Sequence, residues 1–236
     1  MLNAVGLQNP GADFVTEHYL PLLAGCGCNL IANIAGSTVE DYCAVAEKFS
    51  KTAVSMVELN ISCPNVKQGG VQFGTRPEAV FDITAAVRRH CNKPMIVKLS
   101  PNVTDIKENA LAAQEGGADA LSLINTVTGM AIDIKTRRPV LANVTGGLSG
   151  PCVKPIALKM VHDVYCSVRL PIIGMGGISR AEDAVEFMLA GASAVMVGTA
   201  NFTNPYACPE IIDGIADYCS KNGIAKVTEL TGALIV

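Results

Sequence analysis

The chain has 236 residues, of which 50% are apolar, 5% aromatic and 17% charged, and this composition predicts a single compact α/β domain over residues 1–236. Its net charge of -3 comes without a basic stripe, which argues against nucleic acid or an anionic membrane as the main partner. Nine cysteines without a secretory signal peptide predict reduced thiols and a cytoplasmic location.

An uncharged segment near the N-terminus, residues 19–39, has about the length of a membrane span. Pro21, Asn29, Asn33 and three glycines interrupt this segment. Because residues that break helices recur where a strand would begin, we predict a helix end, a turn and a buried strand in place of a membrane helix.

Six apolar segments rich in β-branched residues are predicted strands, and helical patterns separate most of them. The strands are expected at residues 30–35, 56–62, 95–100, 120–126, 171–175 and 194–199. The helices are expected at residues 37–49, 77–90, 105–115, 155–164 and 181–190. Ser179 and Glu182 have the spacing of a capping box at the start of the last helix. The alternation of strands and helices predicts a parallel sheet covered by helices.

Two architectures fit this alternation, a closed TIM (β/α)8 barrel and an open doubly wound sheet. The dinucleotide fingerprint G-x-G-x-x-G is absent after the first strand, which weakens the case for the open sheet. Glycine turns at residues 174–178 and 197–200 favour the barrel, whose last two strand-helix loops usually bind phosphate.

Counting back from these two turns makes residues 30–35 the third strand of a barrel. We therefore expect an incomplete barrel with strands 3 to 8, in which the first two strand-helix units are missing because the chain is truncated at its N-terminus. A barrel without two adjacent strands has two unpaired edges and an open core. The alternative is that the first 27 residues rearrange to cover the gap.

The segment Glu-Leu-Asn-Ile-Ser-Cys-Pro-Asn, residues 58–65, carries a predicted strand into a polar loop. Catalytic groups of parallel α/β folds sit at the carboxyl ends of strands. Cys63 therefore has the position of a proton-transfer residue, with Pro64 stiffening the turn. A buried structural thiol is the alternative for Cys63, since free cysteine is among the most buried residue types.

Glycines after the last two predicted strands indicate a phosphate site. Gly176 and Gly177 allow backbone amides to approach an anion closely, while Gly198 and Thr199 add an amide and a hydroxyl donor. The competing interpretation is that glycines are common in strand-helix turns that bind no ligand.

Asn33, Asn60, Lys98 and Asn125 lie within or at the ends of four otherwise apolar strands. Each needs a partner, because burying an unpaired amide or ammonium group is costly. A planar heterocycle rich in carbonyl groups and ring nitrogens would satisfy several amides at once, with Lys98 stabilising negative charge on the ring. The alternative is that these groups satisfy one another or nearby backbone.

Seven motifs resemble the class 1 dihydroorotate dehydrogenases, flavin enzymes of pyrimidine (UMP) biosynthesis, and they extend over essentially the whole chain. They are residues 3–11, 58–65, 97–99, 124–126, 145–150, 174–178 and 197–199. Residues 67–75 and 131–155 are most similar to the NAD-linked 1B subclass, whose catalytic subunit works with a partner subunit that carries FAD and a 2Fe-2S cluster. The fumarate-using, homodimeric 1A subclass is the nearest alternative.

The resemblance implies an oxidoreductase that converts dihydroorotate to orotate with FMN. Cys63 would be the base that removes a proton from C5 of the substrate, while C6 gives a hydride to N5 of FMN. The residues implied in substrate binding are Asn3, Gly6, Leu7, Asn60, Asn65, Asn125 and Thr126. The residues implied in FMN binding are Asn33, Asn60, Lys98, Ile124, Gly147, Gly176, Gly177, Gly198 and Thr199.

The resemblance also implies a homodimeric core, electron transfer to NAD through the partner subunit, and no metal ion in this subunit. Family members have a first strand that ends in a small-residue turn against the flavin and a second strand that supplies a lysine, and neither precedes the residue 3–11 motif here. The remaining alternatives are an FMN enzyme similar to dihydropyrimidine dehydrogenase and an inactive fragment or scaffold that only binds a partner.

Overall fold

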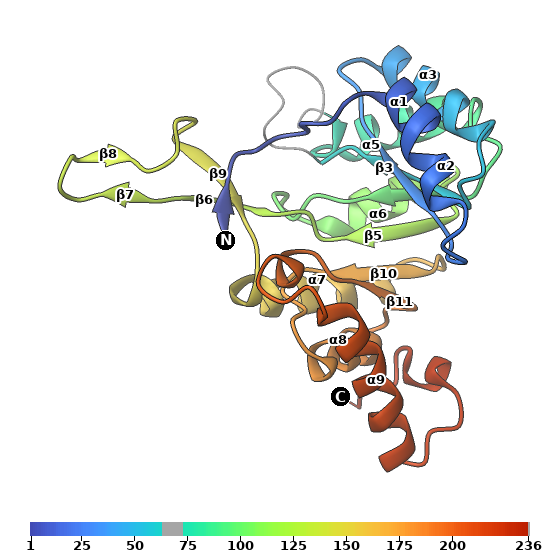
Figure 1. Ribbon diagram of the computed structural model, residues 1–236, viewed down its shortest axis with the longest axis vertical. Helices are drawn as coiled ribbons and strands as arrows, with labels where there is room; N and C mark the ends of the chain where they lie inside the picture. Colours follow the sequence, from blue (N-terminus) through green and yellow to red (C-terminus); the bar gives the residue numbers. More distant parts are fainter. Residues whose placement is uncertain (63–72, 236) are drawn as a thin grey trace. The chain divides into compact units, whose positions relative to one another are not determined.

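The computed structural model describes residues 1–62 and 73–235 (Figure 1). The chain divides into two compact units. The N-unit comprises Val5–Leu99 and Glu108–Leu121, and the C-unit comprises Met1–Ala4, Ser100–Lys107 and Ser122–Val236.

Parallel strands form the sheet of the N-unit, as the sequence predicts. The strands are β2 (Ile31–Ile34), β3 (Met56–Asn60) and β4 (Met95–Lys98). β3 lies between the other two, with Asn33 opposite Glu58 and Asn60 opposite Lys98. Each strand ends one or two residues earlier than predicted, so the polar groups expected at strand ends lie at or near the carboxyl end of the sheet.

The central strand β3 is buried on both faces, which is typical of a parallel sheet covered by helices. Successive side chains of a strand point to opposite faces. Val57 and Leu59 are fully buried on one face, and Glu58 and Asn60, only 2% and 5% exposed, lie on the other. The strand therefore places a polar row inside the unit.

Among the described residues between β2 and β4, two helices pack in the N-unit. α3 (Val39–Ser50) begins with a capping box in which the Thr38 hydroxyl accepts a hydrogen bond from the Asp41 amide at 3.2 Å. The Asp41 carboxylate in return accepts one from the Thr38 amide at 3.0 Å. α5 (Pro77–Arg88) has proline in its first turn, where the missing N–H costs no helical hydrogen bond.

The N-terminal segment of the N-unit is helical and leads into β2. α1 (Ala12–Phe14), a π-helical turn (Val15–Tyr19) and α2 (Leu20–Leu23) follow one another. The predicted helix end, turn and strand in residues 19–39 are confirmed, but the strand is not buried throughout: Ile31 is 41% exposed and Ile34 is 2% exposed. No helix within residues 1–62 and 73–235 is long and apolar enough to cross a membrane.

Two further predicted elements are present, and each contributes residues to both units. They are α6 (Ile106–Glu115) and β5 (Ala120–Leu123). β5 is shorter than its predicted span of residues 120–126, so Asn125 and Thr126 follow the strand instead of belonging to it.

The C-unit contains an antiparallel sheet that the sequence analysis did not predict. Its strands are β1 (Leu2–Asn3), β9 (Thr145–Leu148) and β6 (Val127–Met130), with β9 in the middle. Between β6 and β9 the chain forms the hairpin of β7 (Ile132–Asp133) and β8 (Arg138–Pro139), drawn in yellow-green in Figure 1. These strands are two to four residues long, too short to give a clear alternating pattern.

The rest of the C-unit returns to alternating helices and strands. Its elements are a 3-10 turn (Pro151–Val153), α7 (Lys154–Tyr165), β10 (Ile172–Met175), α8 (Ala181–Leu189), β11 (Ala194–Met196), a 3-10 turn (Thr199–Phe202), α9 (Ala207–Lys221) and a 3-10 turn (Val227–Leu230). β10 and β11 are parallel, with Gly174 opposite Val195. The predicted α7, α8 and both strands are confirmed, and α9 is additional.

Candidate functional site

In the N-unit, four polar residues lie on one face of the sheet. Three of them are predicted site residues, and the fourth, Glu58, lies among them. The parallel register sets Asn33 beside Glu58 and Asn60 beside Lys98. The Asn33 side-chain amide donates a hydrogen bond to the Glu58 carboxylate, and the Asn60 amide donates to the Asn33 side-chain oxygen at 3.4 Å. We call Asn33, Glu58, Asn60 and Lys98 the polar row.

Hydrogen bonds hold the amides of the polar row in position. The Ser62 hydroxyl donates to the side-chain oxygen of Asn60 at 3.2 Å. The alternative that the strand amides satisfy one another is therefore confirmed for Asn33 and Asn60. These hydrogen bonds do not exclude a ligand. An amide group has two donor hydrogens and an oxygen with two lone pairs, so it can bond to more than one partner.

Glu58 belongs to this row, although no role is predicted for it from the sequence. Its side chain is 2% exposed, and a buried carboxylate needs hydrogen-bond donors such as the Asn33 amide. The signal in the sequence is the spacing of Glu58, Asn60 and Ser62, which places three polar residues on one face of an apolar strand.

Tyr42 of α3 anchors the end of β3. Its hydroxyl donates a hydrogen bond of 2.7 Å to the main-chain oxygen of Asn60. Cys63 and Asn65, predicted as catalytic base and substrate ligand, follow this anchored end but lie outside the described residues.

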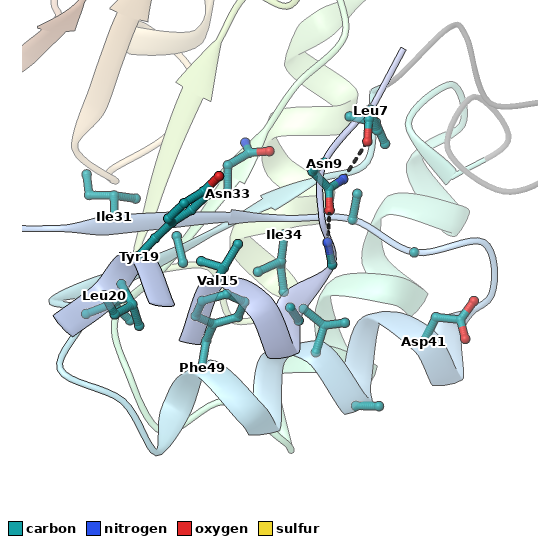
Figure 2. A pocket seen from close by; sticks show the side chains of 18 of the residues that line it. Leu7, Asn9, Val15, Tyr19, Leu20, Ile31, Asn33, Ile34, Asp41 and Phe49 are labelled. Carbon is teal, nitrogen blue, oxygen red and sulfur yellow. Dashed lines mark hydrogen bonds between the residues drawn. The ribbon is translucent and has the colours of Figure 1, made fainter. Parts of the chain in front are cut away.

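A cavity of about 940 Å³ in the N-unit brings three predicted site residues together (Figure 2). Gly6, Leu7 and Asn33 line it, while Asn60 and Lys98 are not among its lining residues. Most of the wall is apolar, and Figure 2 shows Val15, Ile34 and other apolar side chains around the space. The volume lies within the range of pockets that bind small molecules and cofactors.

In the C-unit, the turn after β10 packs closely against the turn after β9. Gly176 and Gly177 have φ of 122° and 89°, values that favour glycine. A Cβ atom on Gly177 would lie 2.8 Å from the main-chain oxygen of Gly150 and 3.0 Å from the main-chain nitrogen of Lys154. Glycine at 177 therefore lets the two turns touch.

The turn after β11 joins the same group. The Thr199 hydroxyl donates a hydrogen bond of 2.8 Å to the Ser149 hydroxyl. A Cβ atom on Gly198 would meet no atom within 4 Å, so the space around this glycine is open. The predicted residues Gly176, Gly177 and Thr199 are thus brought together with Ser149, which the sequence analysis quoted in a motif but did not propose as a ligand. We call the turns at residues 149–150, 176–177 and 198–199 the glycine cradle.

Helix α8, which follows the turn at residues 176–177, begins differently from the prediction. The Asp183 carboxylate accepts hydrogen bonds from the Ser179 amide at 2.9 Å, the Ser179 hydroxyl at 3.0 Å and the Arg180 amide at 3.1 Å. The predicted pairing of Ser179 with Glu182 is wrong, because α8 begins at Ala181 and its third residue is Asp183. Glu182 is instead exposed on the surface.

The remaining predicted residues of the C-unit lie around its antiparallel sheet. Asn3 of β1 pairs with Gly147 of β9, and a Cβ atom on Gly147 would lie 2.3 Å from the Thr126 hydroxyl oxygen. The Thr126 amide donates to the Asn125 side-chain oxygen at 2.7 Å. Ile124 is buried, and its amide donates to the Met175 oxygen, one residue before the 176–177 turn.

Each unit presents a different chemistry. The glycine cradle brings together main-chain amides and the Ser149 and Thr199 hydroxyls, the kinds of group that proteins use for phosphate. In the structure the Thr199 hydroxyl donates to Ser149, and the Ser149 hydroxyl donates to the main-chain oxygen of Met1 at 3.4 Å. The polar row offers amide, carboxylate and ammonium groups, which suit a planar heterocycle with several carbonyl groups and ring nitrogens. Among residues 1–62 and 73–235, no group of three His, Cys, Asp or Glu side chains is arranged to hold a metal ion.

Known proteins identify the group of enzymes to which this chain is related. A family model described as dihydroorotate dehydrogenase matches residues 1–218. A protein of Alkaliphilus oremlandii named "Dihydroorotate dehydrogenase B (NAD(+)), catalytic subunit" is 56% identical over 234 residues, which cover 99% of this chain and 78% of the relative. Proteins of the same name from Geotalea uraniireducens and Parabacteroides distasonis are 57% and 56% identical, covering 100% and 99% of this chain and 77% of each relative. The chain therefore belongs to the dihydroorotate dehydrogenase family.

Proposed function

We propose that the protein is the catalytic subunit of an NAD-linked dihydroorotate dehydrogenase, which oxidises dihydroorotate to orotate in pyrimidine biosynthesis. The observation that carries this proposal is the family match over residues 1–218, together with relatives 56–57% identical that bear this name. The presence of both a phosphate-type cradle and a polar row in the chain supports it.

We propose FMN as the cofactor of this subunit, where it would supply the acceptor for the substrate hydride. The glycine cradle fits its phosphate, because Gly177 permits a close turn and the space at Gly198 is open. Asn33, Asn60 and Lys98 would bind the flavin ring through amide and ammonium groups. The full set of proposed FMN-binding residues is Asn33, Asn60, Lys98, Ile124, Gly147, Gly176, Gly177, Gly198 and Thr199.

The proposed catalytic base is Cys63, which would take the proton from C5 of dihydroorotate. Its place directly after the predicted strand at residues 56–62 suits a group that must reach a ligand at the carboxyl end of the sheet. The substrate would be held by hydrogen bonds from amide side chains and from the main chain. The proposed substrate-binding residues are Asn3, Gly6, Leu7, Asn60, Asn65, Asn125 and Thr126.

We propose that electrons leave this subunit for NAD through a partner subunit with FAD and a 2Fe-2S cluster, attached to a homodimeric core in the cytoplasm. The relatives are named catalytic subunits, which supports a second kind of subunit. Fumarate as the acceptor is the competing proposal. Supplying NAD or fumarate to the purified complex and following orotate formation separates the two.

We further propose that residues 1–236 belong to one FMN-binding barrel domain. The parallel strands of the N-unit and the strand-helix alternation of the C-unit support an α/β barrel.

The activity is tested by turnover of the protein expressed together with its partner subunit. We expect orotate to form from dihydroorotate and no turnover of dihydrouracil. Cys63→Ser should slow turnover at neutral pH by about a hundredfold or more, because a hydroxyl is a much weaker acid and base catalyst than a thiol. Cys26→Ser is the matched control, since Cys26 is exposed and has no proposed role. Unchanged turnover in Cys63→Ser would remove this residue from the mechanism.

A further inference from the structure

One lysine of the C-unit links the glycine cradle to the following helix. Lys154 is the first residue of α7, and its ammonium nitrogen lies 2.7 Å from an Asp183 carboxylate oxygen and 3.0 Å from a Glu186 carboxylate oxygen. The side chains of Lys154 and Asp183 are 19% and 5% exposed. This pair is therefore largely shielded from water, where ion pairs are stronger than on the surface.

The same Asp183 side chain shapes the start of α8. One carboxylate oxygen binds Lys154, while the other accepts hydrogen bonds from the amides of Ser179 and Arg180 and from the Ser179 hydroxyl. These donors follow the 176–177 turn directly in the chain. The carboxylate thus ties the end of that turn to the lysine at the start of α7.

The main chain at Lys154 also touches the turn. The main-chain nitrogen of Lys154 and the oxygen of Gly150 lie within 3.0 Å and 2.8 Å of the position that a Cβ on Gly177 would occupy. Two of the three cradle turns are therefore held together twice, by main-chain packing at Gly177 and by the ion pair between Lys154 and Asp183.

We propose that Lys154 and Asp183 are positioning residues that hold the glycine cradle in its phosphate-binding geometry and so make the protein prefer a phosphorylated flavin to an unphosphorylated one. This inference rests on the proposed FMN function. Lys154 acts indirectly, by holding the turns in position, because its ammonium group is already paired with the carboxylates of Asp183 and Glu186. The energetic reason is preorganisation, since amides already placed for the anion need no ordering when it binds.

Lys154 and Asp183 are both charged at neutral pH, so the ion pair between them persists there. The hydrogen bond to Asp183 raises the pKa of Lys154 above its ordinary value of 10.5, against the opposing effect of partial burial. Burial opposes ionisation of Asp183, but hydrogen bonds from Lys154 and Ser179 outweigh it and lower the pKa of this carboxyl below 3.8. Both groups remain charged throughout the neutral range.

The test compares FMN with riboflavin, which has the same ring but lacks the phosphate. The apoprotein is titrated with each flavin, and the quenching of flavin fluorescence gives both Kd values. We expect Lys154→Met to weaken FMN binding about tenfold and to leave riboflavin binding unchanged, the scale of one charge-assisted interaction. Lys154→Arg should recover most of the preference, because a guanidinium can bridge two carboxylates.

The matched control is Lys159→Met on the same helix, where Lys159 pairs with Asp163 at 2.5 Å on the exposed surface. It should leave both Kd values unchanged. A Lys154→Met protein that weakens both flavins equally, or neither, overturns the inference while the proposed function stands. If Lys154→Met does not fold, Glu186→Gln decides, with a two- to threefold fall in FMN preference expected and an unchanged preference counting against the inference. Wild-type protein that binds neither flavin overturns the proposed function and this inference with it.

Discussion

The buried hydroxyl of Tyr42 donates a hydrogen bond of 2.7 Å to the main-chain oxygen of Asn60 and so ties helix α3 to the last residue of strand β3. The Tyr42 ring, 1% exposed, also stands edge-on to the ring of Phe73, with centroids 6.0 Å apart. Two residues that flank the undescribed segment, Asn60 and Phe73, thus contact the same side chain. Tyr42 therefore joins helix α3, the end of β3 and Phe73 within the N-unit.

Replacing Tyr42 with phenylalanine removes this hydrogen bond but keeps the ring contact. We expect the free energy of unfolding to fall by about 1–2 kcal/mol, because the oxygen of Asn60 loses a buried donor. Urea denaturation followed by circular dichroism measures the change. Tyr206→Phe is the control, since Tyr206 is 69% exposed and its hydroxyl can bond to water. Equal stability of the Tyr42 variant and the wild type would show that the hydroxyl contributes nothing.

Gly177→Ala should destabilise the C-unit more than Gly223→Ala. Both glycines have positive φ, 89° and 67°, so alanine costs about 1–2 kcal/mol of backbone strain at either place. A Cβ atom at 177 would additionally meet the Gly150 oxygen at 2.8 Å, whereas at 223 it would meet nothing within 4 Å. Thermal unfolding of the two variants measures the difference, and equal losses would contradict the close packing of the turns.

The ion pair between Lys154 and Asp183 predicts how stability depends on pH. The folded-state pKa of Asp183 is depressed, so its contribution is present above the unfolded value, about 3.9, and is lost as pH falls through the folded pKa. The pKa of Lys154 is raised, so its contribution is lost only above about pH 10.5. Asp183→Asn should therefore lower stability at neutral pH and show a shallower loss of stability below pH 4 than the wild type.

Urea unfolding of the wild type and of Asp183→Asn at a series of pH values tests this predicted pH dependence. Removing one partner of a largely buried ion pair costs about 3–5 kcal/mol, and the difference between wild type and variant should shrink as Asp183 becomes protonated. Parallel curves for the two proteins across the acid range would contradict the depressed pKa.

Gly147→Ala should weaken orotate binding if Thr126 is a substrate ligand as proposed. A Cβ atom at 147 would lie 2.3 Å from the Thr126 hydroxyl oxygen and would displace it. Gly129→Ala, in the neighbouring strand β6, is the matched control, because a Cβ there meets the flexible Leu2 side chain at 3.3 Å. Isothermal titration with orotate is expected to give about a tenfold higher Kd for the first variant alone. The same Kd for both variants would remove Thr126 from the site.

Cys43 should react with iodoacetamide more slowly than Cys26. Burial raises the pKa of the Cys43 thiol above 9.0, although Arg89 partly opposes the change, and the thiolate is the reactive form. Cys26 is exposed. Mass mapping of alkylated peptides over time at pH 8 gives both rates, and faster labelling of Cys43 would show that the helix α3 surface opens in solution.

Periodic apolar segments determined most of the helices and strands of this protein. β2, β3, β4, β10 and β11 lie within their predicted spans, because continuous apolar runs bounded by turn residues have few other solutions in a parallel sheet. The sequence also placed Asn33, Asn60 and Lys98 on strands and Gly176 and Gly177 in a turn, since these depend on position along one element. Short strands such as β1 and β9 escaped prediction because two and four residues carry too little pattern.

The motifs in the sequence were sufficient to place the chain in its enzyme family. Tertiary structure alone decided which polar groups meet. Strand register set Asn33 beside Glu58, and the start of α8 at Ala181 gave the capping role to Asp183 instead of Glu182. The link from Lys154 to Asp183 joins residues 29 positions apart. Local sequence preferences act over a few residues, whereas such contacts depend on how whole elements pack, and packing is a property of the folded chain.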